Sequence, residues 1–250
     1  MSGRTLVLVR HGESTWNQEN RFSGWRDVPL SERGLHQARN AGQILKDDGF
    51  LFDVAFTSYL KRAIKTLWII LEEMDQMWVP EYKHWSLNER HYGKLQGLNK
   101  AEQAKEYGDA QVHLWRRGWD VRPPQIDDTH DAAFPLHQRQ YTGLKAGIPR
   151  GESLKDTVDR VMPYWEKEIR PHLKKGRNVL VVAHGNSLRA LIKVIENVSE
   201  EAIPGVELPT GTPYVLRLDK HLHPIDSGFR GNSTQIENAI KEVQDQGRAR

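Results

Sequence analysis

The chain of 250 residues contains no cysteine, so it can form neither a disulfide nor a thiolate metal site. It also lacks long hydrophobic runs: the apolar stretch at residues 179–183 has the length of a strand and is far too short to cross a bilayer. The N-terminus shows no signal-peptide pattern, because the short apolar run at 5–9 ends at once in Arg10 and His11. These absences predict a protein with no membrane segment, and they favour the cytoplasm as its location.

A strong charge imbalance is missing as well. Lys and Arg number 36 against 33 Asp and Glu, and the two signs are interleaved along the chain. No run of basic residues resembles a nucleic-acid patch, so we expect no nucleic-acid partner. Hydrophobic residues make up 38% and charged residues 28% of the chain, which is typical of a globular protein. A small anionic ligand is enough to explain the local arginine pairs.

Predicted strands alternate with predicted helices, which indicates an α/β fold with a mainly parallel sheet flanked by helices on both faces. We expect a single domain over residues 1–250. The predicted strands lie at 5–9, 53–57, 82–85 and 178–183, with an edge strand at 213–218. The predicted helices begin near Ser31, after residue 57, at 154–169 with a kink at Pro163, at 188–195, and at Ser233, followed by a mobile tail to residue 250.

The segment from 99 to 148 departs from this alternation. It is polar, and it contains the pair Pro123-Pro124 and the acidic pair Asp127-Asp128. Such a composition predicts short helices joined by an irregular excursion. We therefore expect an insertion that covers the ligand site. Asp127, Asp128, His130 and Asp131 could be taken for a metal cluster, but a flexible acidic loop is the better interpretation because no ordered scaffold fixes ligand geometry.

Two predicted strands run directly into a His-Gly pair, His11-Gly12 and His184-Gly185. Ligands of parallel sheets bind beyond the carboxyl ends of the strands, so both histidines are expected at the same edge of the sheet. Glycine there allows a sharp turn and a close approach to a ligand. A single His-Gly pair after a strand is a common loop feature, whereas two such pairs favour a functional site.

The residue types at this edge suit phosphoryl transfer. A neutral imidazole can accept a phosphoryl group through the ring nitrogen that carries no proton. Arginine is always charged and binds phosphate in bidentate fashion, and Arg10 and Arg62 are predicted at the same edge. We therefore interpret His11 as a phosphoryl acceptor.

Several segments resemble the histidine phosphatase superfamily and, within it, the cofactor-dependent phosphoglycerate mutases. The resemblance runs from residue 4 to about 247 and is carried by the segments at 8–14, 16–17, 19–25, 60–63, 87–93, 95–100 and 183–189. It implies an enzyme of glycolysis and gluconeogenesis that interconverts 3-phosphoglycerate and 2-phosphoglycerate. The cofactor would be 2,3-bisphosphoglycerate, which primes His11 and forms again as the intermediate, with no metal. The family also suggests a homo-oligomer, for which we expect a dimer.

The same resemblance implies the site residues. His11 would carry the phosphoryl group, Glu89 would exchange the proton of the substrate hydroxyl, and His184 would stabilise the transferring group together with Arg10 and Arg62. Phosphate and substrate would contact Gly12, Glu13, Ser14, Thr15, Trp16, Asn17, Ser23, Gly24, Arg90, His91, Tyr92, Lys100, Arg116, Arg117, Gly185 and Asn186. From the residues alone, Arg116-Arg117 could equally be a solvated helix face, and Glu89 could be an ion-pair partner of Arg90.

Three alternatives stay open. A phosphatase on the same fold would pass the phosphoryl group to water, and a bisphosphoglycerate mutase would favour synthesis of the bisphosphate. The insertion and the polar tail favour a mutase, because a cover over the site would exclude water. A binding module without catalysis is the non-enzymatic alternative, but it would not need His11, Glu89 and His184 together.

Overall fold

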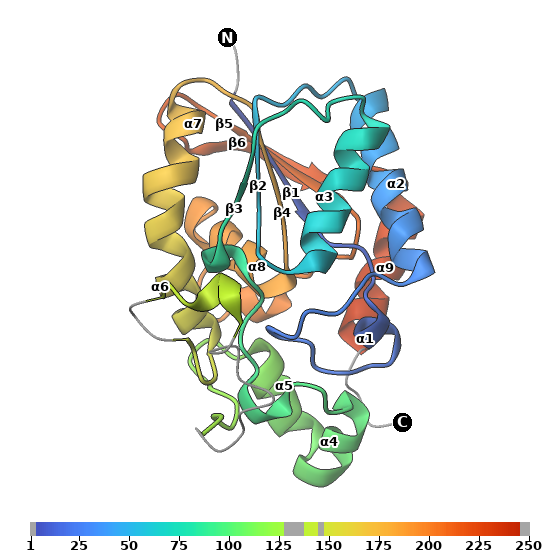
Figure 1. The fold of residues 1–250 in the computed structure, drawn as a ribbon, viewed down its shortest axis with the longest axis vertical. Coiled ribbons are helices and arrows are strands. Elements are labelled where there is room, and N and C mark those ends of the chain that lie inside the picture. The colour runs from blue at the N-terminus through green and yellow to red at the C-terminus, as the bar shows by residue number, and fades with distance from the viewer. Residues whose placement is uncertain (1–3, 128–137, 145–147, 246–250) are drawn as a thin grey trace.

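The computed structural model describes residues 4–127, 138–144 and 148–245. A six-stranded sheet in the order β3-β2-β4-β1-β5-β6 runs through it (Figure 1). The strands are β1 Arg4–Arg10, β2 Val54–Thr57, β3 Glu81–Lys83, β4 Val179–Ala183, β5 Pro213–Leu218 and β6 Pro224–Phe229. The helices are α1 Thr15–Gln18, α2 Glu32–Asp47, α3 Lys61–Glu73, α4 Lys100–Tyr107, α5 Asp109–Arg117, α6 Leu154–Tyr164, α7 Arg170–Lys174, α8 Gly185–Ile195 and α9 Ser233–Asp245.

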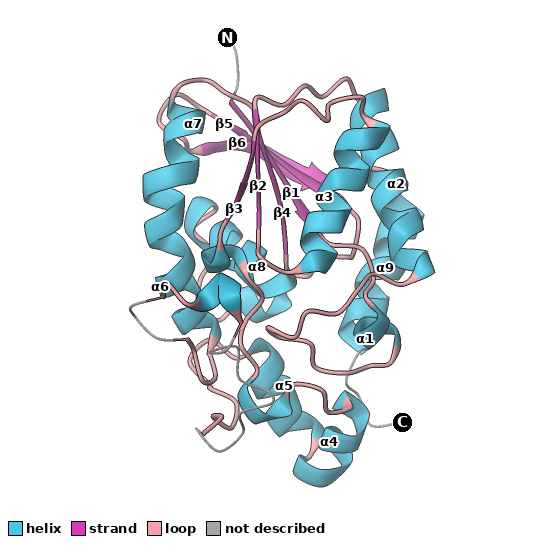
Figure 2. Cartoon of the chain, in the orientation of Figure 1, coloured by secondary structure: helices cyan, strands magenta, loops and turns pink. Residues whose placement is uncertain are grey.

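The predicted α/β architecture is confirmed, with helices on both faces of the sheet (Figure 2). The neighbours β1–β4, β4–β2 and β2–β3 are parallel, whereas β5 runs antiparallel to β1 and β6 runs antiparallel to β5. The prediction of an edge strand at 213–218 is wrong, because β5 lies between β1 and β6. The sheet edge on this side is β6, which is mostly exposed and shows no apolar pattern that predicts a strand.

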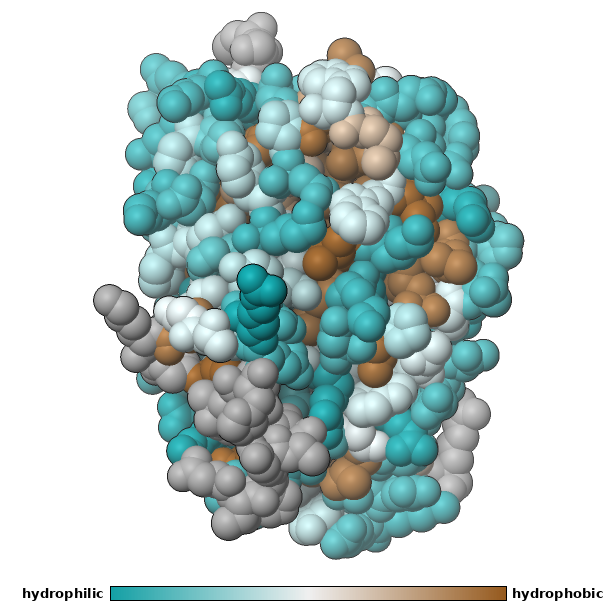
Figure 3. Space-filling view, viewed as in Figure 1, coloured by the Kyte–Doolittle hydropathy of each residue, from teal (hydrophilic) through white to brown (hydrophobic). Residues whose placement is uncertain are grey.

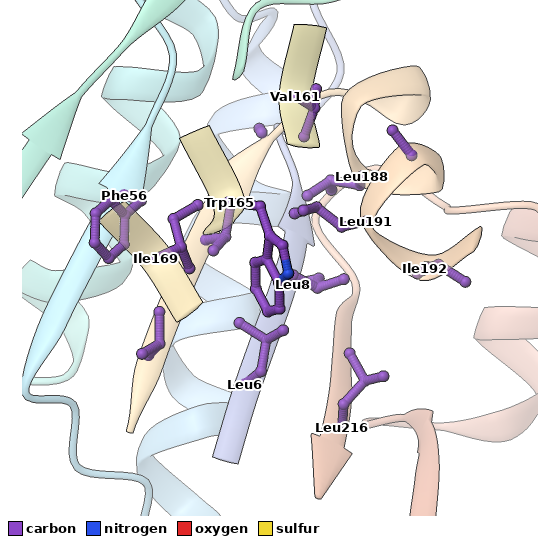
Figure 4. Close-up of a cluster of buried hydrophobic side chains, with 14 of the residues drawn as sticks. Leu6, Leu8, Phe56, Val161, Trp165, Ile169, Leu188, Leu191, Ile192 and Leu216 are labelled. Atoms are coloured by element: carbon purple, nitrogen blue, oxygen red, sulfur yellow. The ribbon is translucent and has the colours of Figure 1, made fainter. Parts of the chain in front are cut away.

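Successive residues of the central strands face opposite layers, as the period of two along a strand requires. Leu6 and Leu8 of β1 pack into the core beneath α6 and α8, whereas Val7 and Val9 pack against α2 and α3. Burial on both faces explains why these strands read as continuous apolar runs. The first core centres on Trp165, whose indole lies among Leu6, Leu8 and Ile169 (Figure 4).

Trp165 reaches this core from an irregular helical run. The predicted helix at 154–169 is helical throughout, but after Pro163 it passes into a π-helical turn at Trp165–Ile169 and then into α7. Proline has no backbone N–H to donate within a helix, which is consistent with a change of hydrogen-bonding pattern at this point.

Helices α4 and α5 lie beyond the carboxyl ends of the parallel strands (Figure 1). They carry the small apolar cluster of Ala104, Val112 and Trp115, which packs with Phe22 and Leu95. The expected short helices of the insertion are therefore present. The rest of the predicted acidic loop, Asp128, His130 and Asp131, and the tail 246–250 lie outside the described residues.

The C-terminal helix α9 lies beside α1, on the side of the molecule where α2 also lies (Figure 1). An ion pair of 2.6 Å joins Arg33 of α2 to Glu242 of α9. Within the part of the chain that the structure describes, no helix is long and apolar enough to span a bilayer.

Candidate active site

The sheet register brings the two histidines together. Arg10, the last residue of β1, is paired with Ala183, the last residue of β4, and His11 N–H donates to the carbonyl of Ala183 at 2.9 Å. His11 and His184 therefore follow neighbouring parallel strands at the same level and point to the same layer. Their ring centroids are 4.9 Å apart in an edge-to-face arrangement. The rings lie at the edge of the sheet where the sequence predicted them.

His11 is held in one protonation state and one tautomer. Its Nδ1 lies 2.6 Å from the carbonyl oxygen of Gly12, which can only accept, so Nδ1 carries the proton and Nε2 is unprotonated. Burial holds the pKa of His11 well below 6.5, and the charges of Arg62 and Arg10 lower it further. The ring is thus a neutral imidazole whose Nε2 is available as a nucleophile.

Arg62 fixes the position of this nitrogen. Its Nε donates to His11 Nε2 at 3.3 Å, while its two terminal nitrogens donate to the carbonyls of Arg26 and Gly24 at 2.8 Å. Arg62 is 1% exposed, and burial lowers the pKa of its guanidinium to about 10, so it stays cationic at neutral pH. Arg10 lies close by, with one terminal nitrogen donating to Leu208 O at 2.9 Å and with Nε buried and without an acceptor among the described residues.

His184 stands behind His11. Its Nε2 lies 2.8 Å from the hydroxyl of Ser58, the residue that follows β2. Burial lowers the pKa of His184 well below 6.5, and Arg62 and His11 lower it further. An anion bound at His11 would offset the positive charge of Arg62 and favour protonation of His184.

Glu89 is the carboxylate of the site, and one of its two oxygens accepts hydrogen bonds from the protein. Oε1 accepts from Arg90 N at 2.8 Å, from Asn186 N at 3.1 Å and from Asn186 Nδ2 at 2.9 Å. Its other oxygen, Oε2, receives no hydrogen bond from the part of the chain that is described. A Cβ at Gly185 would lie 3.6 Å from Arg10 Nε and 3.8 Å from Glu89 Oε2. Gly185 therefore lies between these two groups, and a Cβ there would make contacts of ordinary length.

The backbone of Glu89 is fixed as firmly as its side chain. Its carbonyl accepts from Trp25 Nε1 at 2.6 Å and from Arg160 at 3.3 Å. Arg160 forms a buried ion pair with Glu152, with Nε 2.7 Å from Oε1. The other carboxylate oxygen of Glu152 accepts from His91 N at 2.7 Å. This pair contacts the loop around Glu89 on both sides.

Most of the predicted site residues line one pocket at this edge. They are Arg10, His11, Asn17, Ser23, Gly24, Arg62, Glu89, Tyr92, Lys100, Arg116, Arg117, Gly185 and Asn186. The pocket is strongly cationic, and Glu89 is the carboxylate among its described lining residues. Ser23 Oγ and Arg10 Nε are both buried, and neither has a hydrogen-bond partner among the described residues. Polar atoms left in this state fit a bound anion.

Other predicted residues stand outside the pocket lining. They are Gly12, Glu13, Ser14, Thr15, Trp16, Arg90, His91 and His184. Ser14 caps α1 through a reciprocal pair of bonds with Asn17, which orients Asn17 toward the pocket. Gly12 packs so tightly that a Cβ would lie 2.2 Å from Gly34 O.

Arg90 and His91 follow Glu89 in the chain, but they face the protein interior. Arg90 donates to the carbonyls of Glu152 and Val121, at 2.6 and 2.8 Å, and its guanidinium lies over the ring of Tyr92. Burial lowers the pKa of His91 to about 3. These two residues shape the pocket wall from behind.

The pocket is also lined by residues that the sequence did not predict: Arg21, Phe22, Arg189 and Val243. Phe22 and Arg189 belong to the segments that carry the family resemblance, but nothing in their spacing marks them as pocket residues. Val243 of α9 is 5% exposed and reaches the pocket from the far end of the chain. Across the described residues, no group of three or more His, Asp or Glu side chains is arranged to hold a metal ion.

Comparison with known proteins agrees with this geometry. The family model of the histidine phosphatase superfamily (branch 1) matches residues 6–134 and 127–226. A mycobacterial glucosyl-3-phosphoglycerate phosphatase, solved with VO3, is similar in structure with a TM-score of 0.68 and 24% identity over 90% of this chain and 97% of that chain.

Two further solved structures are similar to the same extent. A phosphoglycerate mutase from Bacillus anthracis has a TM-score of 0.67 and 24% identity over 95% of this chain and 97% of that one. A putative alpha-ribazole-5'-P phosphatase from Escherichia coli has a TM-score of 0.65 and 22% identity, covering 91% and 95% of the two chains. At these identities the likeness establishes the fold.

Proposed function

Because the chain belongs to the histidine phosphatase superfamily (branch 1), we propose that it transfers a phosphoryl group through a phosphohistidine on His11 and interconverts 3-phosphoglycerate and 2-phosphoglycerate. The cofactor in this proposal is 2,3-bisphosphoglycerate, which phosphorylates His11 and forms again in each turnover. The observation that carries the proposal is the unprotonated Nε2 of His11, which is buried beside Arg62 and opens on a pocket of arginines.

The residues present fit a phosphate group. Arg10 Nε and Ser23 Oγ are buried donors that still need an acceptor, and Arg62 stands against His11 Nε2. Phosphoryl transfer develops charge on three equatorial oxygens, so preorganised cations around the nucleophile are the main source of catalysis. His184, adjacent to His11 and neutral before reaction, supports the same charge once it is protonated.

In the first half-reaction Glu89 takes the proton from the free hydroxyl of 3-phosphoglycerate, the hydroxyl oxygen attacks the phosphorus on phosphorylated His11, and the P–N bond breaks to give bound 2,3-bisphosphoglycerate. In the second half-reaction His11 Nε2 attacks the other phosphorus of the bisphosphate, its P–O bond breaks, and the leaving alkoxide takes the proton back from Glu89 to give 2-phosphoglycerate. One carboxylate serves both directions because the two steps mirror one another. The free oxygen Oε2 of Glu89 supports this role.

The far side of the pocket supports a substrate with a second anionic group. Lys100 of α4 and Arg116 and Arg117 of α5 line the pocket together with Tyr92. Arg117 is paired with Glu207 at 2.7 Å, and burial lowers the pKa values of Lys100 and Arg116. Grouping buried cations is unfavourable without a ligand, so a carboxylate or a second phosphate would relieve the repulsion between them.

The cover over the pocket supports a mutase rather than a phosphatase. Helices α4, α5 and α9 all supply lining residues, with Val243 contributed by α9. A closed site keeps water away from the phosphohistidine and keeps the bisphosphate intermediate bound while it turns.

We also propose that the protein is a cytoplasmic homodimer. Trp68 of α3, Trp78 before the edge strand β3 and Tyr82 within it are 43%, 70% and 50% exposed, and Figure 3 shows the face of the molecule on which α3 lies, where apolar and polar side chains are mixed. An edge strand with exposed aromatic side chains is a common site of association. In sedimentation velocity, Tyr82→Lys should shift a dimer toward monomer, and an unchanged monomer in both proteins would contradict the dimer.

Phosphorus NMR tests the reaction. The protein is incubated with 3-phosphoglycerate in chelator, with and without a trace of 2,3-bisphosphoglycerate. The proposal predicts 2-phosphoglycerate, formed faster when the bisphosphate is present. Release of inorganic phosphate without 2-phosphoglycerate would refute the mutase activity and leave a phosphatase.

A further inference from the structure

Arg189 is a buried arginine at the pocket for which the reaction described above has no role. It lies on α8, one helical turn after Asn186, and is 2% exposed. Side chains three positions apart on a helix lie side by side, so Arg189 and Asn186 share one face. That face is turned to the pocket, which both residues line.

The bonding of Arg189 is poor for a buried charge. One terminal nitrogen donates to Asn186 Oδ1, whereas Nε and the other terminal nitrogen find no acceptor within the described ranges. Burial and the charge of Arg117 lower its pKa to about 9. A buried cation with unfilled donors costs folding free energy, so stability does not account for this residue.

Arg160 of the same protein, whose nitrogens have acceptors in the protein itself, is a useful comparison for the bonding of Arg189. Its side chain is only 5% exposed, but it forms an ion pair with Glu152 and donates to the carbonyls of Ser86, Asn88 and Glu89. Arg189 has none of this compensation and reaches only the side chain of Asn186. Its position therefore points to a role in the site.

Asn186 has two ways to orient its amide, and only one of them suits Glu89. In the observed orientation Nδ2 donates to Glu89 Oε1 at 2.9 Å and to Tyr92 Oη at 3.1 Å, while Oδ1 accepts from Arg189. A flipped amide would turn its oxygen toward the Glu89 carboxylate and its NH₂ toward the guanidinium. Both contacts would be repulsive. A donor-only guanidinium beside Oδ1 thus selects the orientation that serves Glu89.

We propose that Arg189 is a positioning residue, which fixes the amide of Asn186 and through it holds Glu89 with Oε1 bound and Oε2 free for proton transfer. This inference rests on the proposed role of Glu89 in the reaction. It assigns to Arg189 no contact with substrate, and it rests on the bond from the guanidinium to Asn186 Oδ1.

Replacement of Arg189 by Met removes the donor while keeping the volume of the side chain. Glu89 then loses a fixed donor to Oε1, and its carboxylate becomes mobile. Misplacing a proton-transfer group lowers kcat by about tenfold or more, with little effect on substrate affinity. Arg189→Lys keeps a donor within reach of Asn186 and should restore most of the lost kcat. Arg170→Met, which removes a partly exposed arginine outside the pocket lining, is the control for loss of one charge.

A double-mutant cycle with Asn186→Ala separates positioning from other roles. If Arg189 acts through Asn186, Arg189→Met should change kcat by less than about twofold in the Asn186→Ala background. Equal losses in both backgrounds, or a rise in KM with kcat unchanged, would overturn the proposal.

The side-chain amide of Asn186, followed by proton–nitrogen NMR and assigned with Asn186→Ala, gives a readout that does not depend on turnover. Its Nδ2 donates to Glu89 and to Tyr92, so the Nδ2 protons should exchange slowly with water in the unmodified protein. In Arg189→Met nothing selects one orientation of the amide, so these protons should exchange faster. Identical exchange in the two proteins would overturn the positioning role. Absence of 2-phosphoglycerate with the unmodified protein would instead refute the proposed mutase activity and leave this comparison valid. If Arg189→Met does not fold, the same exchange is compared in Arg189→Lys, where an unchanged rate is expected, and in Arg189→Leu, where a faster rate is expected. An unchanged rate in Arg189→Leu would refute the coupling.

Discussion

The buried pair of Arg160 and Glu152 offers a prediction whose size follows from the structure. The Arg160 and Glu152 side chains are 5% and 4% exposed, and the guanidinium is bound by both carboxylate oxygens, at 2.7 and 3.0 Å. The perturbation is Arg160→Met, which keeps most of the apolar volume and removes the charge.

The loss of one partner leaves the carboxylate of Glu152 buried without its counter-ion. Breaking a buried pair in this way costs about 3–5 kcal/mol of unfolding free energy. For a chain of this size each kcal/mol lowers Tm by roughly 2–4 °C, so Arg160→Met should lower Tm by roughly 6–20 °C. Activity should fall as well, because Arg160 and Glu152 hold the backbone on both sides of Glu89.

Arg170→Met is the matched control. Arg170 pairs with Glu166 one turn away at 2.7 Å, but the two side chains are 33% and 50% exposed. Pairs of this kind contribute about 0.3–0.5 kcal/mol, so Tm should fall by no more than about 2 °C.

The assay is calorimetry of the two variants and of Glu152→Met/Arg160→Met, together with kcat at saturating substrate. The double replacement should cost less than the sum of the single replacements, because neither charge is then left alone. If the Tm of Arg160→Met lay within about 2 °C of that of Arg170→Met, the claim that the Arg160–Glu152 pair stabilises the backbone around Glu89 would be refuted.

Two further predictions concern the nucleophile and its loop. Gly12→Ala would place Cβ 2.2 Å from Gly34 O, so in urea unfolding it should lower the free energy of unfolding by several kcal/mol, roughly as severe overpacking does. The control is Gly205→Ala, whose Cβ would have no atom within 4 Å and which should be close to neutral. Equal stability of the two variants would contradict the close packing at Gly12. Arg62 lowers the pKa of His11, so Arg62→Met should raise that pKa. Because only neutral His11 accepts a phosphoryl group, the acidic limb of phosphoenzyme formation should move to higher pH in rapid-quench measurements, and a limb that stayed in place would disprove the electrostatic role of Arg62.

The central part of the site could be predicted because it depends on strand ends. Continuous apolar runs identified β1 and β4, and parallel neighbours in register necessarily bring the residues after them together. This is why His11 and His184 were placed correctly from the sequence. Arg62 follows the same logic, since it lies in the first turn of the helix after β2.

The outer parts of the fold and site were less predictable. Strand β6 is exposed along most of its length, so its sequence has no apolar pattern that predicts a strand. The sequence therefore places the edge of the sheet at β5 instead. Residues next to Glu89 were expected at the ligand, but local backbone direction turns Arg90 and His91 inward, where each finds partners in the loop around Glu152.

Arg189 and Val243 show a different limit. Each reaches the pocket through tertiary packing of a helix whose sequence pattern alone says only that it is amphipathic. A buried arginine with unfilled donors could be recognised only once the partners of every nitrogen were known.

The most direct test of the account is the chemical form of the phosphoenzyme. The protein is incubated with 2,3-bisphosphoglycerate, quenched in base, and examined by phosphorus–nitrogen correlation NMR, with His11→Asn and His184→Asn as comparison variants. The account predicts one acid-labile phosphohistidine, bonded through Nε2 of His11, which is absent from His11→Asn and still detectable in His184→Asn. A phosphoryl group found on His184, on Nδ1 of His11, or on no histidine at all would contradict it.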